Sequence, residues 1–246
     1  MSECGGAAAP PVGQAGARRR DELRAGLDGV HDRIVAACAS AGRDPDEVTL
    51  VVVTKTYPAS DVRLLASLGV RDVGENRDQE AGPKHDLCAG LGLRWHFVGQ
   101  VQSNKARHVA RYADIVQSVD RLSLVRALGR GAREAGRSLA CLVQLSLDGD
   151  PARGGVPIDA VPALARAIVD EPGLELHGVM AVAPLGADPE VAFEPLPQLR
   201  DRLLREHPGA RIISAGMSGD LEAALRHGAT HLRVGTAVLG ARPPLR

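Results

Sequence analysis

Short apolar runs alternate with amphipathic stretches along most of the chain. Eight segments have the pattern of strands, because each is a brief run rich in apolar or β-branched residues bounded by turn-forming residues. These segments are 50–53, 71–73, 93–98, 114–119, 139–147, 174–182, 211–213 and 230–234. Segments with helical spacing stand between them, and the connections are short. This alternation over about 200 residues predicts an α/β protein with a single (β/α)8 TIM barrel.

A longer helix is expected before the first strand. Between residues 19 and 41 the apolar side chains recur at helical spacing, at Leu23, Leu27, Val30, Ile34 and Cys38, and this amphipathic helix would cover one end or side of the core. Residues 1–18, rich in Gly, Ala and Pro before a run of arginines, are expected to be a disordered N-terminal segment, with the barrel at 19–246.

Later helices are predicted from cap residues and spacing. Ser60, Ser103 and Asp120 are each expected to cap the helix that follows. One helix is expected over 191–206, with two prolines in its first turns, and another over 219–226. A doubly wound open sheet is the alternative fold, but no GxGxxG motif follows the first strand, so a dinucleotide-binding fold has no support.

Composition narrows the function classes. The chain has 246 residues, 44% of them hydrophobic, which suffices for one large core. Its 30 basic residues balance 30 acidic ones and aromatics are only 2%, which argues against nucleic acid as a partner. No apolar run approaches the ~20 residues of a membrane span, and no secretory signal is evident. A cytoplasmic protein is therefore expected.

Neither cysteines nor histidines have the spacing of a metal site. The four cysteines form no CxxC pair, and Cys38 and Cys141 lie in apolar patterns where a thiol acts as a small core residue. The eight histidines show no HxH or HxxxH spacing. His96, on a predicted strand, is expected to be a hydrogen-bonded structural histidine.

The first strand ends on a lysine. Lys55 follows a run of valines, and Pro58 stops the strand shortly afterwards. In closed barrels the carboxyl ends of the strands face the active site, so Lys55 is expected to point at a ligand, where it could act as a Schiff-base nucleophile. The alternative is that Lys55 only pairs with a carboxylate such as Glu75.

Two loops rich in hydrogen-bond donors follow the last two strands. The segment 214–220 leads directly into a helix after the seventh strand, and 233–236 follows the eighth. Barrels commonly bind phosphate between these two loops. The glycines allow close approach of the backbone, and Ser218 and Thr236 add hydroxyl donors. The alternative is that Ser218 only caps its helix and the glycines form turns. A lysine with a phosphate site indicates a phosphorylated carbonyl compound, either pyridoxal 5′-phosphate (PLP) or a sugar phosphate.

Five blocks of sequence resemble the YggS/PROSC family of pyridoxal phosphate homeostasis proteins. They are Val53-Thr54-Lys55-Thr56, GENRDQE at 74–80, WHFVGQVQSNK at 95–105, MSGDLEAA at 217–224 and VGTAVLGAR at 234–242. The resemblance covers residues 50–242 and implies a barrel like the N-terminal domain of alanine racemase. Gln100, Val101 and Asp78 depart from the family pattern, at positions that would not touch the cofactor.

The resemblance also implies a cofactor and its contacts. PLP would be covalently attached as a Schiff base to Lys55, with Arg233 facing the pyridine nitrogen and Asn76 beside the ring. Ser218, Gly235 and Thr236 would hold the phosphate, and Met217 and Gly219 would add backbone contacts. An arginine at the pyridine nitrogen weakens the ring as an electron sink, and the chain ends soon after the eighth strand, without the second domain of a racemase.

The function expected from these features is PLP homeostasis, in which PLP is held and buffered or supplied without catalysis. A PLP-dependent racemase of small amino acids and, less favoured, a Schiff-base aldolase acting on a sugar phosphate are the alternatives. The expected partners are PLP and apo forms of PLP-dependent enzymes, with no nucleic acid and no membrane, and a monomer is expected.

Overall fold

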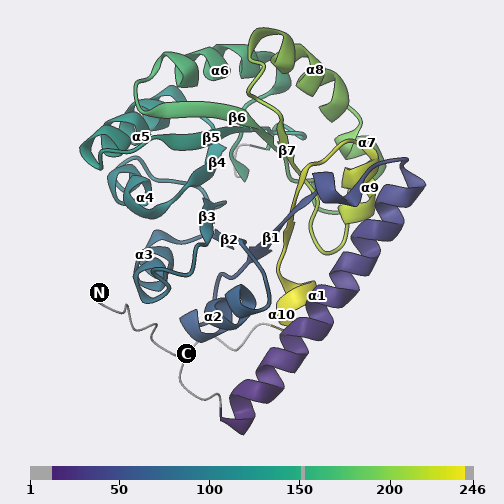
Figure 1. Cartoon of the computed structure of the whole chain (residues 1–246). Coiled ribbons are helices and arrows are strands. Elements are labelled where there is room, and N and C mark those ends of the chain that lie inside the picture. The colour runs from purple at the N-terminus through teal and green to yellow at the C-terminus, as the bar shows by residue number, and fades with distance from the viewer. Residues whose placement is uncertain (1–12, 151–152, 242–246) are drawn as a thin grey trace, which may run out of the picture.

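Eight parallel strands form a closed barrel in the computed structural model, which describes residues 13–150 and 153–241 (Figure 1). Each strand pairs with the next in sequence, and the first pairs with the last. The strands are β1 (Thr49–Val53), β2 (Asp72–Glu75), β3 (Arg94–Phe97), β4 (Ile115–Val119), β5 (Leu139–Gln144), β6 (Leu174–Met180), β7 (Ile212–Ser214) and β8 (His231–Val234). The predicted (β/α)8 barrel is confirmed, and the doubly wound sheet is wrong.

The pairing of β1 with β8 closes the barrel beside the site. Its register runs from Thr49 opposite His231 to Val52 opposite Val234, so the loops that follow these two strands are neighbours. Val52 packs outward into the main hydrophobic cluster, whereas the side chains of its neighbours Val51 and Val53 lie against Gly74 of β2. The strand is thus enclosed on two faces, which explains its unbroken apolar sequence.

Helices surround the barrel as an outer layer (Figure 1). After α1 (Gln14–Ser40) they are α2 (Ala59–Ser67), α3 (Asp78–Leu87), α4 (Ala106–Tyr112), α5 (Leu122–Glu134), α6 (Val161–Asp170), α7 (Pro189–Phe193), α8 (Leu196–Glu206), α9 (Leu221–Arg226) and α10 (Thr236–Leu239), with the 3₁₀ turns η1 (Pro45–Glu47) and η3 (Ile158–Ala160). The helix predicted over 191–206 is two helices. Pro195 is the N-cap of α8, and a proline cannot donate the backbone hydrogen bond that a continuous helix would need.

The three predicted serine and aspartate caps are wrong. Ser60 lies inside the first turn of α2, which begins one residue earlier, and α4 and α5 begin after Lys105 and Arg121. Ser103 and Asp120 instead accept hydrogen bonds from the guanidinium of Arg121. A helix start shifted by one or two residues directs the side chain away from the free backbone N–H groups that a cap must reach.

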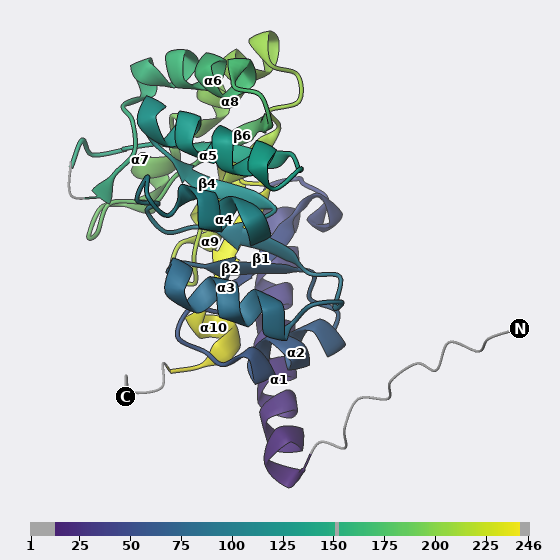
Figure 2. The ribbon, with the colours of Figure 1, turned by 90° about the vertical axis from the view of Figure 1, so that its left-hand side faces the viewer.

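α1 (Gln14–Ser40) lies along the outside of the barrel and packs against α2, α9 and α10 (Figure 1). Its first turns extend beyond the barrel (Figure 2). The helix begins at Gln14, so 14–18 are helical, and the part of the disordered-segment prediction that covers 1–12 lies outside the described residues. Leu23, Val30, Ile34 and Cys38 are buried, as the helical spacing predicts.

The three described cysteines lie in the core. Cys38, Cys88 and Cys141 are free and buried, which agrees with the prediction that Cys38 and Cys141 act as core residues; Cys4 lies outside the described residues. Burial raises the pKa of each of these three thiols.

Within 13–150 and 153–241, no helix is long and apolar enough to cross a membrane, and no cluster of His, Cys, Asp and Glu could hold a metal ion.

Candidate functional site

The carboxyl ends of the strands surround a cavity of about 410 Å³, a size typical of small-molecule sites. Its lining includes all eight residues singled out from the sequence: Lys55, Asn76, Met217, Ser218, Gly219, Arg233, Gly235 and Thr236. Sequence reasoning missed the other lining residues: Val53, Tyr57, Val98, Met180 and Val182. Each of these stands at or just after the end of a strand, which is the signal that could have found them.

Lys55 is the lysine of this cavity. The sequence contains two others, Lys84 and Lys105, and neither lines the cavity. Lys84 is buried, and its Nζ donates to Glu75 Oε1 over 2.6 Å. Lys84 therefore supplies a cation that pairs with Glu75.

Charged side chains of the neighbouring β2–α3 unit hold the loop that carries Lys55. Lys84 Nζ also donates to the Thr54 carbonyl over 2.9 Å, and the Thr54 hydroxyl donates to Glu75 Oε1 over 2.6 Å. The Thr56 N–H donates to Glu80 Oε2 over 3.1 Å. Burial raises the pKa of Glu75, although Lys84 and Thr54 oppose this. These bonds fix the backbone on both sides of the lysine.

Thr56 has the unusual backbone of a functional loop. Its φ is 71°, in the left-handed region that β-branched residues rarely adopt, and its hydroxyl is buried without a hydrogen-bond partner. Such strain persists where the surrounding structure enforces it, and it concentrates at binding sites. The contacts described above supply that enforcement beside Lys55.

The loops after β7 and β8 meet on the other side of the cavity. The Ala237 N–H donates to Ser218 Oγ over 3.3 Å, and this bond joins the two loops. The Met217 N–H donates to Asp220 Oδ1 over 2.5 Å. Asp220 is the N-cap of α9, so the alternative in which Ser218 merely caps this helix is wrong. Ser218 and Thr236, one from each loop, both line the cavity, and their hydroxyl groups are of the kind that can bind an anionic group.

Arg233 places a fixed positive charge in the cavity wall. Its side chain is 5% exposed, and its Nη2 donates to the Ala181 carbonyl over 2.8 Å while Nη1 donates to Ser214 Oγ over 2.7 Å. Burial lowers the pKa of Arg233 to about 10. The guanidinium therefore remains charged at neutral pH.

A chain of buried hydrogen bonds runs from Arg233 into the barrel. Ser214 Oγ donates to Gln117 Oε1 over 2.7 Å, Gln117 Nε2 lies 2.8 Å from His96 Nδ1, and His96 Nε2 lies 2.9 Å from Asp72 Oδ1. The arginine fixes the direction of every bond, because a guanidinium can only donate. Ser214 accepts from Arg233 and donates to Gln117, and the Gln117 amide donates to His96. His96 must accept at Nδ1 and carry its proton on Nε2. His96 is thus the satisfied structural histidine expected from the sequence, and neither it nor Ser214 lines the cavity.

The far end of the chain is also charged. Asp72 accepts from Arg94 over 2.8 Å. Burial alone would raise the pKa of Asp72, but the bonds from His96 and Arg94 outweigh it and the pKa is lowered. The ring of His231 lies 6.2 Å from that of His96, and burial, reinforced by His96, lowers the pKa of His231 to about 4. His231 is therefore neutral in the folded protein at pH 7.

Asn76 lies directly against the loop after β3. A Cβ atom on Gly99 would clash with the carbonyl and the side-chain oxygen of Asn76, so only glycine permits this approach. Asp78, one of the departures from the family pattern, accepts hydrogen bonds from His108 and Tyr112. Neither Asp78 nor these partners lines the cavity, in agreement with the expectation that this departure leaves the site intact.

The structure is a closed (β/α)8 barrel whose strand ends surround a cavity lined by Lys55, Arg233, Ser218 and Thr236, among other residues. A profile of the alanine racemase N-terminal domain matches residues 17–243. The pyridoxal phosphate homeostasis protein of Mycobacterium leprae is 44% identical over 240 residues, which cover 90% of this chain and 93% of that protein. The protein of the same name from Corynebacterium glutamicum is 46% identical over 221 residues, covering 86% and 98%.

A solved structure is similar as well. PipY of Synechococcus elongatus PCC7942, determined with PLP bound, superposes with a TM-score of 0.72 at 34% identity, and the match covers 84% of this chain and all of that one. The chain belongs to the alanine racemase N-terminal domain family, in the branch of the pyridoxal phosphate homeostasis proteins. The resemblance found in the sequence is confirmed.

Proposed function

We propose that this protein holds PLP covalently on Lys55 and buffers or supplies it without catalytic turnover. The observation that carries the proposal is the arrangement of one cavity, in which the only lining lysine of the described residues shares the wall with buried Arg233 and the hydroxyls of Ser218 and Thr236. An aldehyde, a ring nitrogen and a phosphate at three corners of one small molecule fit these groups. The name shared by the relatives and the PLP bound to PipY support the same ligand.

Each of the eight lining residues singled out from the sequence has a role in this proposal. The Lys55 amine binds the aldehyde carbon, and the Arg233 guanidinium faces the pyridine nitrogen. Asn76, which Gly99 holds in place, lies beside the ring. The phosphate is bound by Ser218, Gly235 and Thr236, with backbone contacts from Met217 and Gly219. When bound, PLP supplies a reactive carbonyl and an electron-withdrawing ring.

The titratable side chains that line the cavity support the absence of turnover. Among the described lining residues, the side chains that can exchange protons are Lys55, Tyr57 and Arg233. The Tyr57 hydroxyl already donates to the Gly240 carbonyl over 2.8 Å. A racemase needs acid–base groups on both faces of its substrate, and the described lining offers no carboxylate, imidazole or thiol. A charged Arg233 also disfavours protonation of the ring nitrogen.

The racemase and aldolase alternatives are accordingly weaker. The lining groups do not provide the pair of bases that a racemase uses, and a sugar-phosphate aldolase would share neither the name of the relatives nor the ligand of PipY. We further propose that the protein acts in the cytoplasm, as a monomer, and that apo forms of PLP-dependent enzymes receive the cofactor. An exchange of PLP between proteins requires only that an incoming amine displaces Lys55.

Borohydride reduction tests the attachment. The protein is loaded with PLP, reduced and digested, and the pyridoxyl group should be found on the peptide containing Lys55. Lys55→Ala should lose the adduct, whereas the matched control Lys105→Ala should retain it, because Lys105 does not line the cavity. An adduct found chiefly on Lys84 or Lys105 would contradict the proposal.

A further inference from the structure

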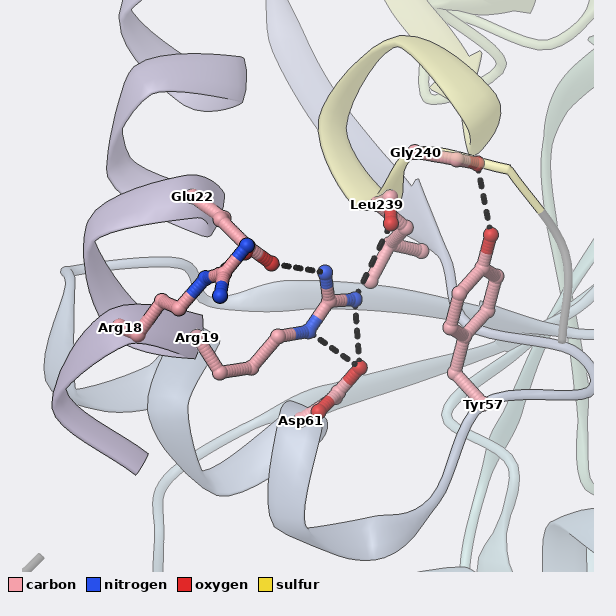
Figure 3. Close-up of polar contacts among 7 residues, drawn as sticks. All are labelled: Arg18, Arg19, Glu22, Tyr57, Asp61, Leu239 and Gly240. Atoms are coloured by element: carbon pink, nitrogen blue, oxygen red, sulfur yellow. Dashed lines mark hydrogen bonds and ion pairs between the residues drawn. The ribbon is translucent and has the colours of Figure 1, made fainter. Parts of the chain in front are cut away.

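The first half of α1 contacts the elements on both sides of the cavity. α2 follows the loop that carries Lys55, and α10 begins at Thr236. α1 packs against both helices, and Figure 3 shows the polar contacts where the three meet. None of the residues that α1 contributes here lines the cavity.

Arg19 of α1 joins α2 to α10 (Figure 3). Its Nε and Nη2 donate to Asp61 Oδ2 over 3.1 and 2.7 Å, and Nη2 also donates to the Leu239 carbonyl over 3.0 Å. Glu22, on the same helix as Arg19, accepts from Nη1 over 3.2 Å. The Arg19 side chain is 27% exposed and that of Asp61 is 8% exposed. A charge-assisted contact shielded in this way is stronger than an ion pair on the open surface.

A second link runs beside the first. Tyr57, two residues after Lys55, donates from its hydroxyl to the Gly240 carbonyl over 2.8 Å (Figure 3). The Arg19 guanidinium carbon lies 6.0 Å from the centre of the Tyr57 ring, within the range of a cation–π contact. The lysine loop is thus tied directly to the end of α10, and Arg19 contacts Tyr57 and Leu239, the residue before Gly240.

The backbones of α1 and α10 also touch. A Cβ atom on Gly26 would clash with the carbonyl of Val238, whereas a Cβ atom on Gly29, one turn further along α1, would meet nothing within 4 Å. Gly26 therefore allows α1 to lie directly against α10. Any displacement of α1 would be transmitted to the segment that starts at Gly235.

We propose that Arg19 is a positioning residue for PLP: through Asp61 and the Leu239 carbonyl it fixes the separation between the Lys55 loop and the phosphate-binding Gly235–Thr236 segment. The proposal rests on the proposed function. PLP is anchored at both places, so its affinity depends on their separation, in the way that a two-point ligand depends on the spacing of its sites. Of these two anchors, pyridoxal, which lacks the phosphate, uses only the lysine, and inorganic phosphate uses only the phosphate-binding segment.

Arg19→Ala and Arg18→Ala form a matched pair. The Arg18 side chain is 86% exposed and pairs along its own helix with Glu22, so Arg18→Ala should bind all three ligands as the wild type does. Arg19→Ala should raise the dissociation constant for PLP at least about fivefold, because the two anchors lose their fixed spacing. Its constants for pyridoxal and inorganic phosphate should change less than about twofold. Equilibrium dialysis measures all three, and thermal unfolding is recorded alongside.

Two further variants keep the test decisive if Arg19→Ala folds poorly. Asp61→Asn removes the charge from the other side of the contact and should give the same PLP-selective loss. Gly26→Ala should do so by pushing against Val238, whereas Gly29→Ala, a substitution of the same kind in open space, should not.

Two results would overturn the inference. One is unchanged PLP affinity in both Arg19→Ala and Asp61→Asn. The other is an equal loss for PLP, pyridoxal and phosphate that follows the loss of thermal stability, which would assign Arg19 a purely structural role. If the proposed function itself is wrong, a different result is expected: the wild type yields no borohydride adduct on Lys55.

Discussion

Arg233 donates a hydrogen bond to Ser214 over 2.7 Å, and both side chains are buried. Ser214 in turn donates to Gln117, a residue 97 positions away in the sequence. The charge that faces the cavity is therefore held by a polar chain that crosses the barrel interior, so the site extends well below the residues that line it. Buried polar chains of this kind are costly to interrupt, because each unsatisfied group loses its hydration without compensation.

Replacing Ser214 tests the chain. Ser214→Ala leaves one N–H of Arg233 and the amide oxygen of Gln117 without their partner, and we expect the free energy of unfolding to fall by about 1–3 kcal/mol. PLP affinity should fall as well, since Arg233 is no longer held in place. Denaturant unfolding and PLP titration measure the two effects. The exposed Ser40, whose hydroxyl bonds only to its own helix, provides the control Ser40→Ala, and equal behaviour of the two variants would contradict the account.

The phosphate-binding residues are tested by a double replacement. Ser218→Ala with Thr236→Ala removes two hydroxyl donors to a charged group, each worth about 1.5–3 kcal/mol. PLP affinity should therefore fall by at least about tenfold. Affinity for pyridoxal, which lacks the phosphate, should change little. If both ligands lost affinity equally, the phosphate would have to lie elsewhere.

His231 predicts a dependence of stability on pH. Its pKa in the folded protein is about 4, against 6.5 for an ordinary histidine, so between these values the unfolded state binds more protons than the folded one. Stability must then fall as pH falls from 6.5 to 4, by at most about 3 kcal/mol from this residue. His231→Gln cannot take up the proton, so its unfolding free energy should fall less over this window. Parallel curves for the two proteins would show that the histidine is not held neutral.

Local pattern predicted the barrel, and the eight site residues expected from strand ends, loops and the family resemblance all line one cavity. Lys55, Asn76 and Arg233 follow or end strands, and in a closed parallel barrel all such ends meet at one face. The contacts that hold the site depend on tertiary structure instead. Nothing in the sequence relates Ser214 to Gln117, or Arg19 to Leu239, because these residues are brought together only when the barrel closes and α1 packs on it.

Local sequence pattern also failed to predict the residues at which three of the helices begin. Ser60, Ser103 and Asp120 are all residues that favour N-caps, yet packing sets each helix start one or two residues away from them. α1 begins at Gln14 and has no side-chain cap at its N-terminus. Burial against the barrel outweighs a cap, which contributes only about 1 kcal/mol.

Assembly is a further prediction. A single chain brings Lys55, Arg233, Ser218 and Thr236 to one cavity, so we expect PLP binding without a second copy. Sedimentation should show a monomer, and the PLP dissociation constant should be the same across a wide range of protein concentration. A tight dimer whose disruption abolishes PLP binding would contradict this.

The exchange of the α-proton of an amino acid tests the central claim most directly. The PLP-loaded protein is incubated with L-alanine in deuterated buffer, and deuterium at the α-carbon is followed by mass spectrometry. The described residues of the cavity lining include no carboxylate, imidazole or thiol, and Arg233 is expected to disfavour protonation of the ring nitrogen, so the spectrum of the bound cofactor should change while the α-proton is retained. Rapid deuterium incorporation, at the about 1–10³ per second of a typical enzyme, would contradict the carrier function and favour the racemase.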